Sequence, residues 1–171
     1  MLTMPASHDI LPDEIAQLTQ PLFEALPLEQ AMQQLVVQQP AAQAHHDLVG
    51  QLVLEPVIAD RPALASALWL YVDDMDRSHV ISQNIETPTG SYWHGIMHRR
   101  EGDLSNSHYL FRKVGHHPAI AIVRDACDGE YDPHTFIDEA EAACMKGESP
   151  ATPIRRQQSE WMTLFGWCAD K

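Results

Sequence analysis

The sequence predicts an all-α fold of stacked antiparallel helical hairpins, with about eight to ten helices. Apolar residues recur at three- and four-residue spacing along much of the chain. Proline or a capping residue begins several of these stretches, and glycine ends several of them. A weak internal repeat falls on two of the predicted turns between helices. The hairpins are tetratricopeptide-like by analogy.

The length and composition indicate one folded domain. The chain has 171 residues, of which 44% are hydrophobic and 20% charged. This is enough for one well-packed core and too little for two comfortable ones. We therefore expect a single all-α domain over residues 1–171, with residues 1–9 loose and residues 62–118 forming the central helical hairpins.

The first 60 residues carry mixed signals. Pro12 and the acids after it predict a helix start, and Pro21 predicts a break or kink soon after. Apolar spacing predicts a second helix over about 28–38. Residues 44–55 have a β-rich composition, but their length and neighbours favour a helix that ends before Pro56. The adjacent His45 and His46 diverge on such a helix, and we expect both to be exposed.

Clearer signals follow from Pro62 onward. Prolines at first helical positions, caps at Asp103 and Asp132, and glycines at helix ends define the segments. The predicted helices cover, in order, residues beginning at 62, then about 75–86, 91–101, 104–114, 118–127, 132–146 and 152–167. In the last helix the apolar positions recur at helical spacing and predict a face that docks on the body. These positions are Trp161, Leu164, Phe165 and Cys168.

The internal repeat matches residues 73–79, DDMDRSH, with residues 102–108, GDLSNSH. The second copy follows the first by 29 residues (102 − 73). Each copy is predicted to lie at the turn between two short antiparallel helices, as in helical-repeat proteins. The period is shorter than the roughly 34 residues of a tetratricopeptide repeat, and the signature of that repeat is missing.

Charge narrows the possible partners. The net charge is −13, which argues against nucleic acid. Residues 91–115 instead hold four basic and two acidic side chains, a net +2 that leaves −15 for the rest. Such a region can attract an anionic small molecule or an acidic protein partner, although its bases could equally pair with acids of neighbouring helices. No apolar run predicts a membrane span, no secretory signal is visible, and the three cysteines suit a reducing cytoplasm.

Helical geometry concentrates polar groups on one face of each central helix. At 100° per residue, His94, His98 and Glu101 lie opposite the apolar face formed by Tyr92, Trp93, Ile96 and Met97. The repeat places His79 with Gln83, and His108 with Arg112, on equivalent faces, with Tyr109 flanking the second pair. The predicted ligand-binding residues are therefore His79, Gln83, His94, His98, Glu101, His108, Tyr109 and Arg112.

These faces have two interpretations. In the first they converge on a pocket, where His94 and His98 could bind one divalent metal and Glu101 or a third histidine could complete the set. Without a metal, histidine beside a carboxylate and an arginine suits acid–base work on an anionic substrate. In the second interpretation the faces meet solvent or neighbouring helices and the histidines are structural. H-x-x-x-H alone is a weak signal.

The same stretch resembles a family. Trp93, His94, His98, Arg99, Glu101, Gly102 and Asp103, continued by Asn106, Tyr109 and Arg112, fit a W-H-x-x-x-H-R-x-E-G-D-x-x-N-x-x-Y-x-x-R core. This core is similar to that of a group of bacterial and fungal proteins with no established activity. The similarity covers about residues 66–118 and the last helix, with Leu110 and Phe111 as departures. It supports the choice of site and implies no reaction.

Three functional hypotheses follow. The first is a helical domain that binds an anionic small molecule or acidic partner at its histidine- and arginine-lined face. The second is a metal-dependent or acid–base enzyme that uses the same face. The third is a structural protein-interaction module in which the histidines have no chemical role. The sequence leaves open whether the protein is an enzyme.

Overall fold

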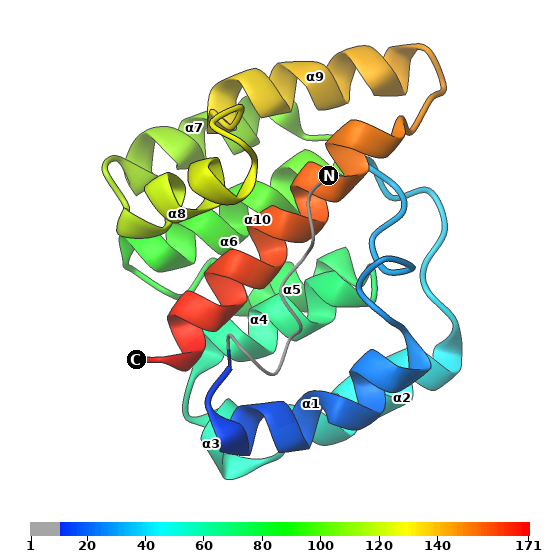
Figure 1. Ribbon diagram of the computed structural model, residues 1–171, viewed down its shortest axis with the longest axis vertical. Helices are drawn as coiled ribbons and strands as arrows, with labels where there is room; N and C mark the ends of the chain where they lie inside the picture. The colour runs from blue at the N-terminus through cyan, green and yellow to red at the C-terminus, as the bar shows by residue number, and fades with distance from the viewer. Residues whose placement is uncertain (1–10) are drawn as a thin grey trace.

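The computed structural model describes residues 11–171, and the segment 1–9 that was expected to be loose lies outside them. The described residues form ten α-helices and no strand, which confirms the predicted class and number of helices (Figure 1). The helices are α1 Asp13–Ala25, α2 Gln43–Leu52, α3 Pro56–Ala59, α4 Pro62–Tyr71, α5 Met75–Ser82, α6 Pro88–Glu101, α7 Leu104–Val114, α8 Pro118–Ala126, α9 Pro133–Met145 and α10 Ala151–Ala169.

Two consecutive hairpins, α4–α5 and α6–α7, form the centre of the molecule. Helix α6 packs against α4, α5 and α7, so it joins the two hairpins. Helix α10 crosses this centre and packs against α4, α8 and α9 (Figure 1). Helices α1–α3 lie at one end of the molecule and α9 at the other. Among the described residues, no helix combines the length and apolar content that a bilayer crossing requires.

The two hairpins have matching turns. Asp73 and Gly102, which are equivalent in the repeat, both have positive φ, at 58° and 90°. The next residue in each copy is the N-cap: Asp74 accepts a hydrogen bond from the Arg77 N–H, and Asp103 accepts one from the Asn106 N–H. A carboxylate at the N-cap satisfies an N–H that has no partner within the helix. The repeat therefore corresponds to a shared turn structure.

A second equivalent contact lies deeper in each hairpin. In α4–α5 the hydroxyls of Ser66 and Ser78 lie 2.9 Å apart. In α6–α7 the Ser107 hydroxyl donates to the Gly95 carbonyl at 2.7 Å. Ser107 and Gly95 lie 29 residues after Ser78 and Ser66, so the same pairs of positions touch in both hairpins. All four residues are small, which allows the paired helices to approach closely.

Residues 28–38 form irregular turns, so the helix predicted there is wrong. Tertiary hydrogen bonds replace the helical ones. Gln157 donates to the carbonyls of Met32 and Gln34, Gln158 donates to the Ala31 carbonyl, and the Arg100 carbonyl accepts from the N–H of Val37. Buried backbone groups need partners, and α6 and α10 supply them here. The spacing of apolar residues within the segment cannot predict these tertiary hydrogen bonds.

Two further predictions for the N-terminal region differ from the structure. Helix α1 continues through Pro21 without a break, and buried residues on both sides of the proline, such as Thr19 and Leu22, hold it to the core. His45 and His46 are half-buried, not exposed. A ring nitrogen of His46 lies 2.8 Å from the Val72 carbonyl, because α2 packs against α4.

The core is aromatic and centres on α10. Trp161 stacks on Phe165 and donates to the Ala67 carbonyl, while Tyr71 and Phe23 contact the same indole ring. The predicted docking face of the last helix is confirmed, since all four of its apolar positions are buried. The predicted apolar face of α6 is confirmed in the same way, which leaves the opposite face of α6 available for polar groups.

Candidate metal centre

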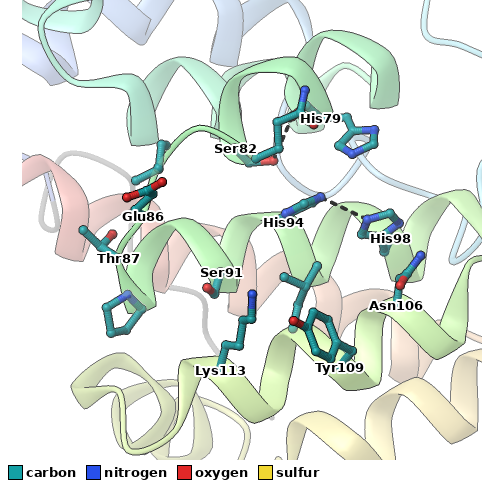
Figure 2. A pocket seen from close by; sticks show the side chains of 14 residues that line it. His79, Ser82, Glu86, Thr87, Ser91, His94, His98, Asn106, Tyr109 and Lys113 are labelled. Atoms are coloured by element: carbon teal, nitrogen blue, oxygen red, sulfur yellow. Dashed lines mark hydrogen bonds between the residues drawn. The ribbon is translucent and has the colours of Figure 1, made fainter.

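Three histidines from α5 and α6 meet at one point. His94 and His98 occupy consecutive turns of α6, so their side chains lie one above the other. His79 comes from α5, which packs beside α6. Figure 2 shows the His79 ring reaching toward the other two across the space between the helices. The ring centroid of His79 lies 4.9 Å from that of His94 and 5.1 Å from that of His98.

Their ring nitrogens are close enough to share a cation. One nitrogen of each ring lies within 4.8 Å of the others, and Nε2 of His94 lies 3.0 Å from Nε2 of His98. At Zn–N distances of about 2.0–2.1 Å, two nitrogens on one tetrahedral ion lie about 3.3 Å apart. Small rotations of the rings would give that separation. Three imidazoles suit zinc, iron, copper or nickel.

Acidic side chains hold His98 from its other nitrogen. Glu101 Oε1 lies 2.5 Å from Nδ1 of His98, and Asp103 Oδ2 lies 3.8 Å from it. Metal-binding histidines commonly donate their second N–H to a carboxylate, which fixes the tautomer and the orientation of the ring. A proton on Nδ1 leaves the Nε2 lone pair of His98 directed toward His94. The donor set thus has a supporting carboxylate of its own.

His94 is prepared to act as a neutral ligand. Partial burial, followed by the nearby charges of His98, His79 and Lys113, lowers the pKa of His94 to about 4. A histidine with a low pKa carries no proton on its second nitrogen at neutral pH, and only such a neutral ring can bind a metal. The environment of the site therefore disfavours an imidazolium at this position.

The histidines lie at a pocket of about 730 Å³, a size that accepts a small molecule. Its walls come from α5, the turn before α6, α6 itself and α7. The lining residues are His79, Ser82, Gln83, Ile85, Glu86, Thr87, Pro88, Ser91, His94, His98, Asn106, Tyr109, Leu110 and Lys113. A metal held by the three histidines would therefore face a space that a ligand can enter.

The structure brings together five of the eight predicted site residues at this pocket: His79, Gln83, His94, His98 and Tyr109. Glu101 does not line it and instead contacts His98 from behind. His108 and Arg112 lie on another part of the α7 surface and are not among the lining residues.

His108 has different partners from its repeat equivalent, His79. Its Nδ1 lies 2.8 Å from Nδ1 of His134, and its Nε2 lies 3.0 Å from Asp138. Helix α7 packs between α6 and α9, so a side chain on its outer side meets α9. Helix α5 packs against α4 and α6, so its histidine meets α6. The two equivalent faces therefore do not converge on one pocket.

Asn106 and Lys113 line the pocket, although the sequence-based selection omitted them. Together with Tyr109 and Leu110 they are spaced i, i+3, i+4 and i+7, which is a signature of one helix face. The repeat pointed to His108 and Arg112 instead, and these lie on an adjacent face of α7. The ammonium group of Lys113 lies 4.7 Å from the centre of the Tyr109 ring.

Two other groups of residues offer less chemistry. Burial raises the pKa of the Cys127 and Cys168 thiols to about 11, so neither is a thiolate at neutral pH. His117 is buried: Nδ1 accepts from the Ala119 N–H, and Nε2 lies 3.0 Å from the Thr89 hydroxyl. The first bond caps the start of α8 and the second joins it to the start of α6, so His117 has a structural role.

Comparisons with protein-family models, with curated proteins and with solved structures found no match. The function must therefore be argued from the three-histidine site itself.

Proposed function

We propose that the protein is a metal-dependent enzyme that binds one divalent transition-metal ion through His79, His94 and His98. The observation that carries the proposal is the convergence of three ring nitrogens within 4.8 Å at the wall of an open pocket. Structural zinc sites are closed by four protein ligands, whereas catalytic sites use three and keep a position for water or substrate. Three histidines with one open position match the ligand number of catalytic zinc sites, so zinc is the metal we propose.

Such an ion would supply Lewis-acid chemistry. It would polarise a carbonyl or phosphoryl oxygen, or lower the pKa of a bound water to about 7. The chain's own residues have separate tasks in this scheme. Glu101 orients His98, the three imidazoles hold the ion, and the pocket wall binds the substrate. The proposed reaction class is metal-assisted hydrolysis or a related addition of water.

The test is metal content with matched variants. Untagged protein is stripped with a chelator, titrated with Zn²⁺, and analysed for bound metal after gel filtration. We expect one equivalent in the native protein and loss of that equivalent in His79→Ala, His94→Ala and His98→Ala. His108→Ala is the control, because it removes a half-buried histidine that does not line the pocket, and it should keep its metal.

Catalysis is tested on the same samples. The zinc-loaded protein should hydrolyse a model ester such as p-nitrophenyl acetate faster than the stripped protein and the His94→Ala variant do. A native protein that binds no metal would overturn the proposal. Metal that stays bound in all three histidine variants, each folded normally by circular dichroism, would overturn it as well.

A second candidate is a binding domain that takes an anionic small molecule in the same pocket without a metal. The presence of Lys113 in the pocket wall favours it. This hypothesis becomes the leading one if the native protein retains no metal and His98→Ala weakens ligand binding while leaving folding unchanged. If His98→Ala instead unfolds the protein, the histidines serve the structure and the interaction-module hypothesis gains support.

The similarity of the hairpins to tetratricopeptide repeats remains an analogy and does not enter the proposed function.

A further inference from the structure

The pocket wall contains one lysine, Lys113, that lies in direct contact with no acidic side chain of the described residues. Lys113 is exposed, and no ion pair joins it to any acid in residues 11–171. Its ammonium lies against the face of the Tyr109 ring, and its charge is among those that lower the pKa of His94. Six other lysines and arginines in the described residues also lack an ion pair, so Lys113 is distinguished by its position in the pocket wall.

The charged residues of the pocket lie at different distances from the histidines. Lys113 is the one basic and Glu86 the one acidic residue in the lining besides the histidines, so their formal charges cancel. A divalent ion at the histidines would make the pocket +2. Figure 2 shows Lys113 on α7 opposite Ser91, between the histidines and the end formed by Glu86 and Thr87. A ligand at the histidines would therefore meet Lys113 before it meets Glu86.

The remaining lining residues limit the kind of anion. The pocket has no arginine, so the planar fork that grips a phosphate in two-point contact is missing. One ammonium, the amide of Asn106 and the hydroxyl of Ser91 provide a few single donors. Ile85, Leu110 and the Tyr109 ring add apolar wall on either side. One charged donor beside apolar surface matches a carboxylate on a short carbon chain better than a phosphate.

We propose that the substrates are small organic carboxylates, whose carboxylate pairs with Lys113 while their reacting group lies at the metal held by His79, His94 and His98. This inference rests on the proposed metal-dependent function. It assigns Lys113 the role of substrate anchor and a determinant of specificity. Asn106 and Ser91 would contribute single hydrogen bonds to the same bound molecule.

Calorimetric titration of the zinc-loaded protein tests the assignment. The probes are butyrate, its neutral analogue butyramide, and inorganic phosphate. The variant is Lys113→Met, which removes the charge and shortens the side chain by one heavy atom. Lys146→Met is the control, because Lys146 is an exposed lysine at the end of α9 and does not line the pocket. Zinc content is measured on every sample before titration.

We expect native protein and Lys146→Met to bind butyrate at least tenfold more tightly than butyramide. Lys113→Met should keep one equivalent of zinc and bind butyrate roughly tenfold more weakly, with butyramide unchanged, as expected for loss of one charged hydrogen bond. Equal butyrate affinity in Lys113→Met and native protein would overturn the inference, as would phosphate binding tighter than butyrate.

The two proposals fail in different ways. Absence of zinc from the native protein overturns the metal-dependent function and, with it, the anchor role built on that function. One equivalent of zinc together with an affinity for butyrate that does not depend on Lys113 overturns the carboxylate assignment alone.

Discussion

Glu101 and His98 form a short contact beside the three-histidine cluster, with Oε1 lying 2.5 Å from Nδ1. The two residues are one helical turn apart at the end of α6. The ring is buried and the carboxylate is partly exposed, so the acid can be changed without opening the core. Because the carboxylate fixes the orientation of the ring, it should control how tightly the three histidines would bind a metal.

We expect Glu101→Gln to weaken zinc binding by about 10- to 100-fold while the protein stays folded. Competition with a zinc-sensitive dye would measure the affinity. Glu141→Gln, an exposed change on α9, is the control and should bind zinc like the native protein. An affinity in Glu101→Gln equal to that of the control would show that the contact does not serve the metal.

Arg99 and Glu160 form a fully buried ion pair that ties α6 to α10. Both side chains have no solvent exposure, and the guanidinium donates to each carboxylate oxygen, at 3.0 and 2.5 Å. Tyr131 also donates to this carboxylate at 2.6 Å. We expect Glu160→Gln to lower the free energy of unfolding by about 3–5 kcal/mol, because it leaves a buried guanidinium uncompensated.

Urea unfolding followed by circular dichroism would measure this loss. Tyr131→Phe is the matched comparison, since it removes one donor to Glu160 and keeps the ion pair. It should cost about 2 kcal/mol. A smaller loss in Glu160→Gln than in Tyr131→Phe would contradict the view that the ion pair dominates this contact.

Glycine is required at position 90, in the first turn of α6, because the preceding segment that lines the pocket packs against it. A Cβ at this position would lie 2.0 Å from the carbonyl oxygen of Ile85, well inside contact distance. Gly90→Ala must therefore displace the backbone, and we expect a loss of stability of about 2–3 kcal/mol. Because Ile85 lines the pocket, the same change should weaken ligand binding.

Gly50 provides a control of opposite sign. It lies within α2, and a Cβ there would meet its nearest neighbour, the Trp69 ring, at 3.9 Å, an ordinary contact. Gly50→Ala should raise the free energy of unfolding by roughly 0.5–1 kcal/mol, because alanine favours the helix. Thermal unfolding of the two variants would compare them directly. Equal effects would show that the contact with Ile85 does not constrain residue 90.

Asp132 caps α9, and its contribution to stability should depend on pH. The backbone N–H of Thr135, which donates to the carboxylate at 2.9 Å, is the main cause that lowers the pKa of Asp132. Asp132→Ala should cost about 1 kcal/mol at pH 7. Since the folded pKa lies below the unfolded one, this contribution is complete above the unfolded pKa of about 3.9 and is lost as the pH falls through the folded pKa.

Urea unfolding at pH 7 and at pH 3 would measure the difference between native protein and Asp132→Ala. The difference should shrink at the lower pH. Asp125→Ala changes an exposed acid within α8 that is not an N-cap, and it should lose no stability at either pH. A cost for Asp132→Ala that stays the same at both pH values would mean that the charge of the cap does not contribute.

Helices are predicted correctly where capping residues and the spacing of apolar residues indicate the same segment. Asp103 and Asp132 are N-caps as expected, and the apolar face of α6 is buried as its spacing indicates. Segment 28–38 carries equally regular apolar spacing, yet Gln157 and Gln158, more than 100 residues away in the chain, bind its carbonyls. Local periodicity holds no information about such partners, so that helix prediction was wrong.

The candidate site was predictable within one helix and less so between helices. His94 and His98 share a face of α6 by spacing alone, and their closeness follows from helix geometry. The convergence of His79 depends on which side of α5 packs against α6. The separation of His108 depends on α9, which covers the outer side of α7. The position of Lys113 likewise depends on the rotation of α7 about its axis, which spacing leaves undetermined.

The shared turn structure of the two hairpins has a consequence for the placement of their histidines. Residues 29 positions apart have the same backbone setting, so His79 and His108 occupy corresponding places on two copies of one scaffold. One copy directs its imidazole to the pocket and the other directs it to a neighbouring helix. The difference comes from the neighbouring helix, which is α6 for the first hairpin and α9 for the second. Whether a histidine at this repeat position faces a pocket or a helix is therefore set by its place in the stack of hairpins and not by the local turn.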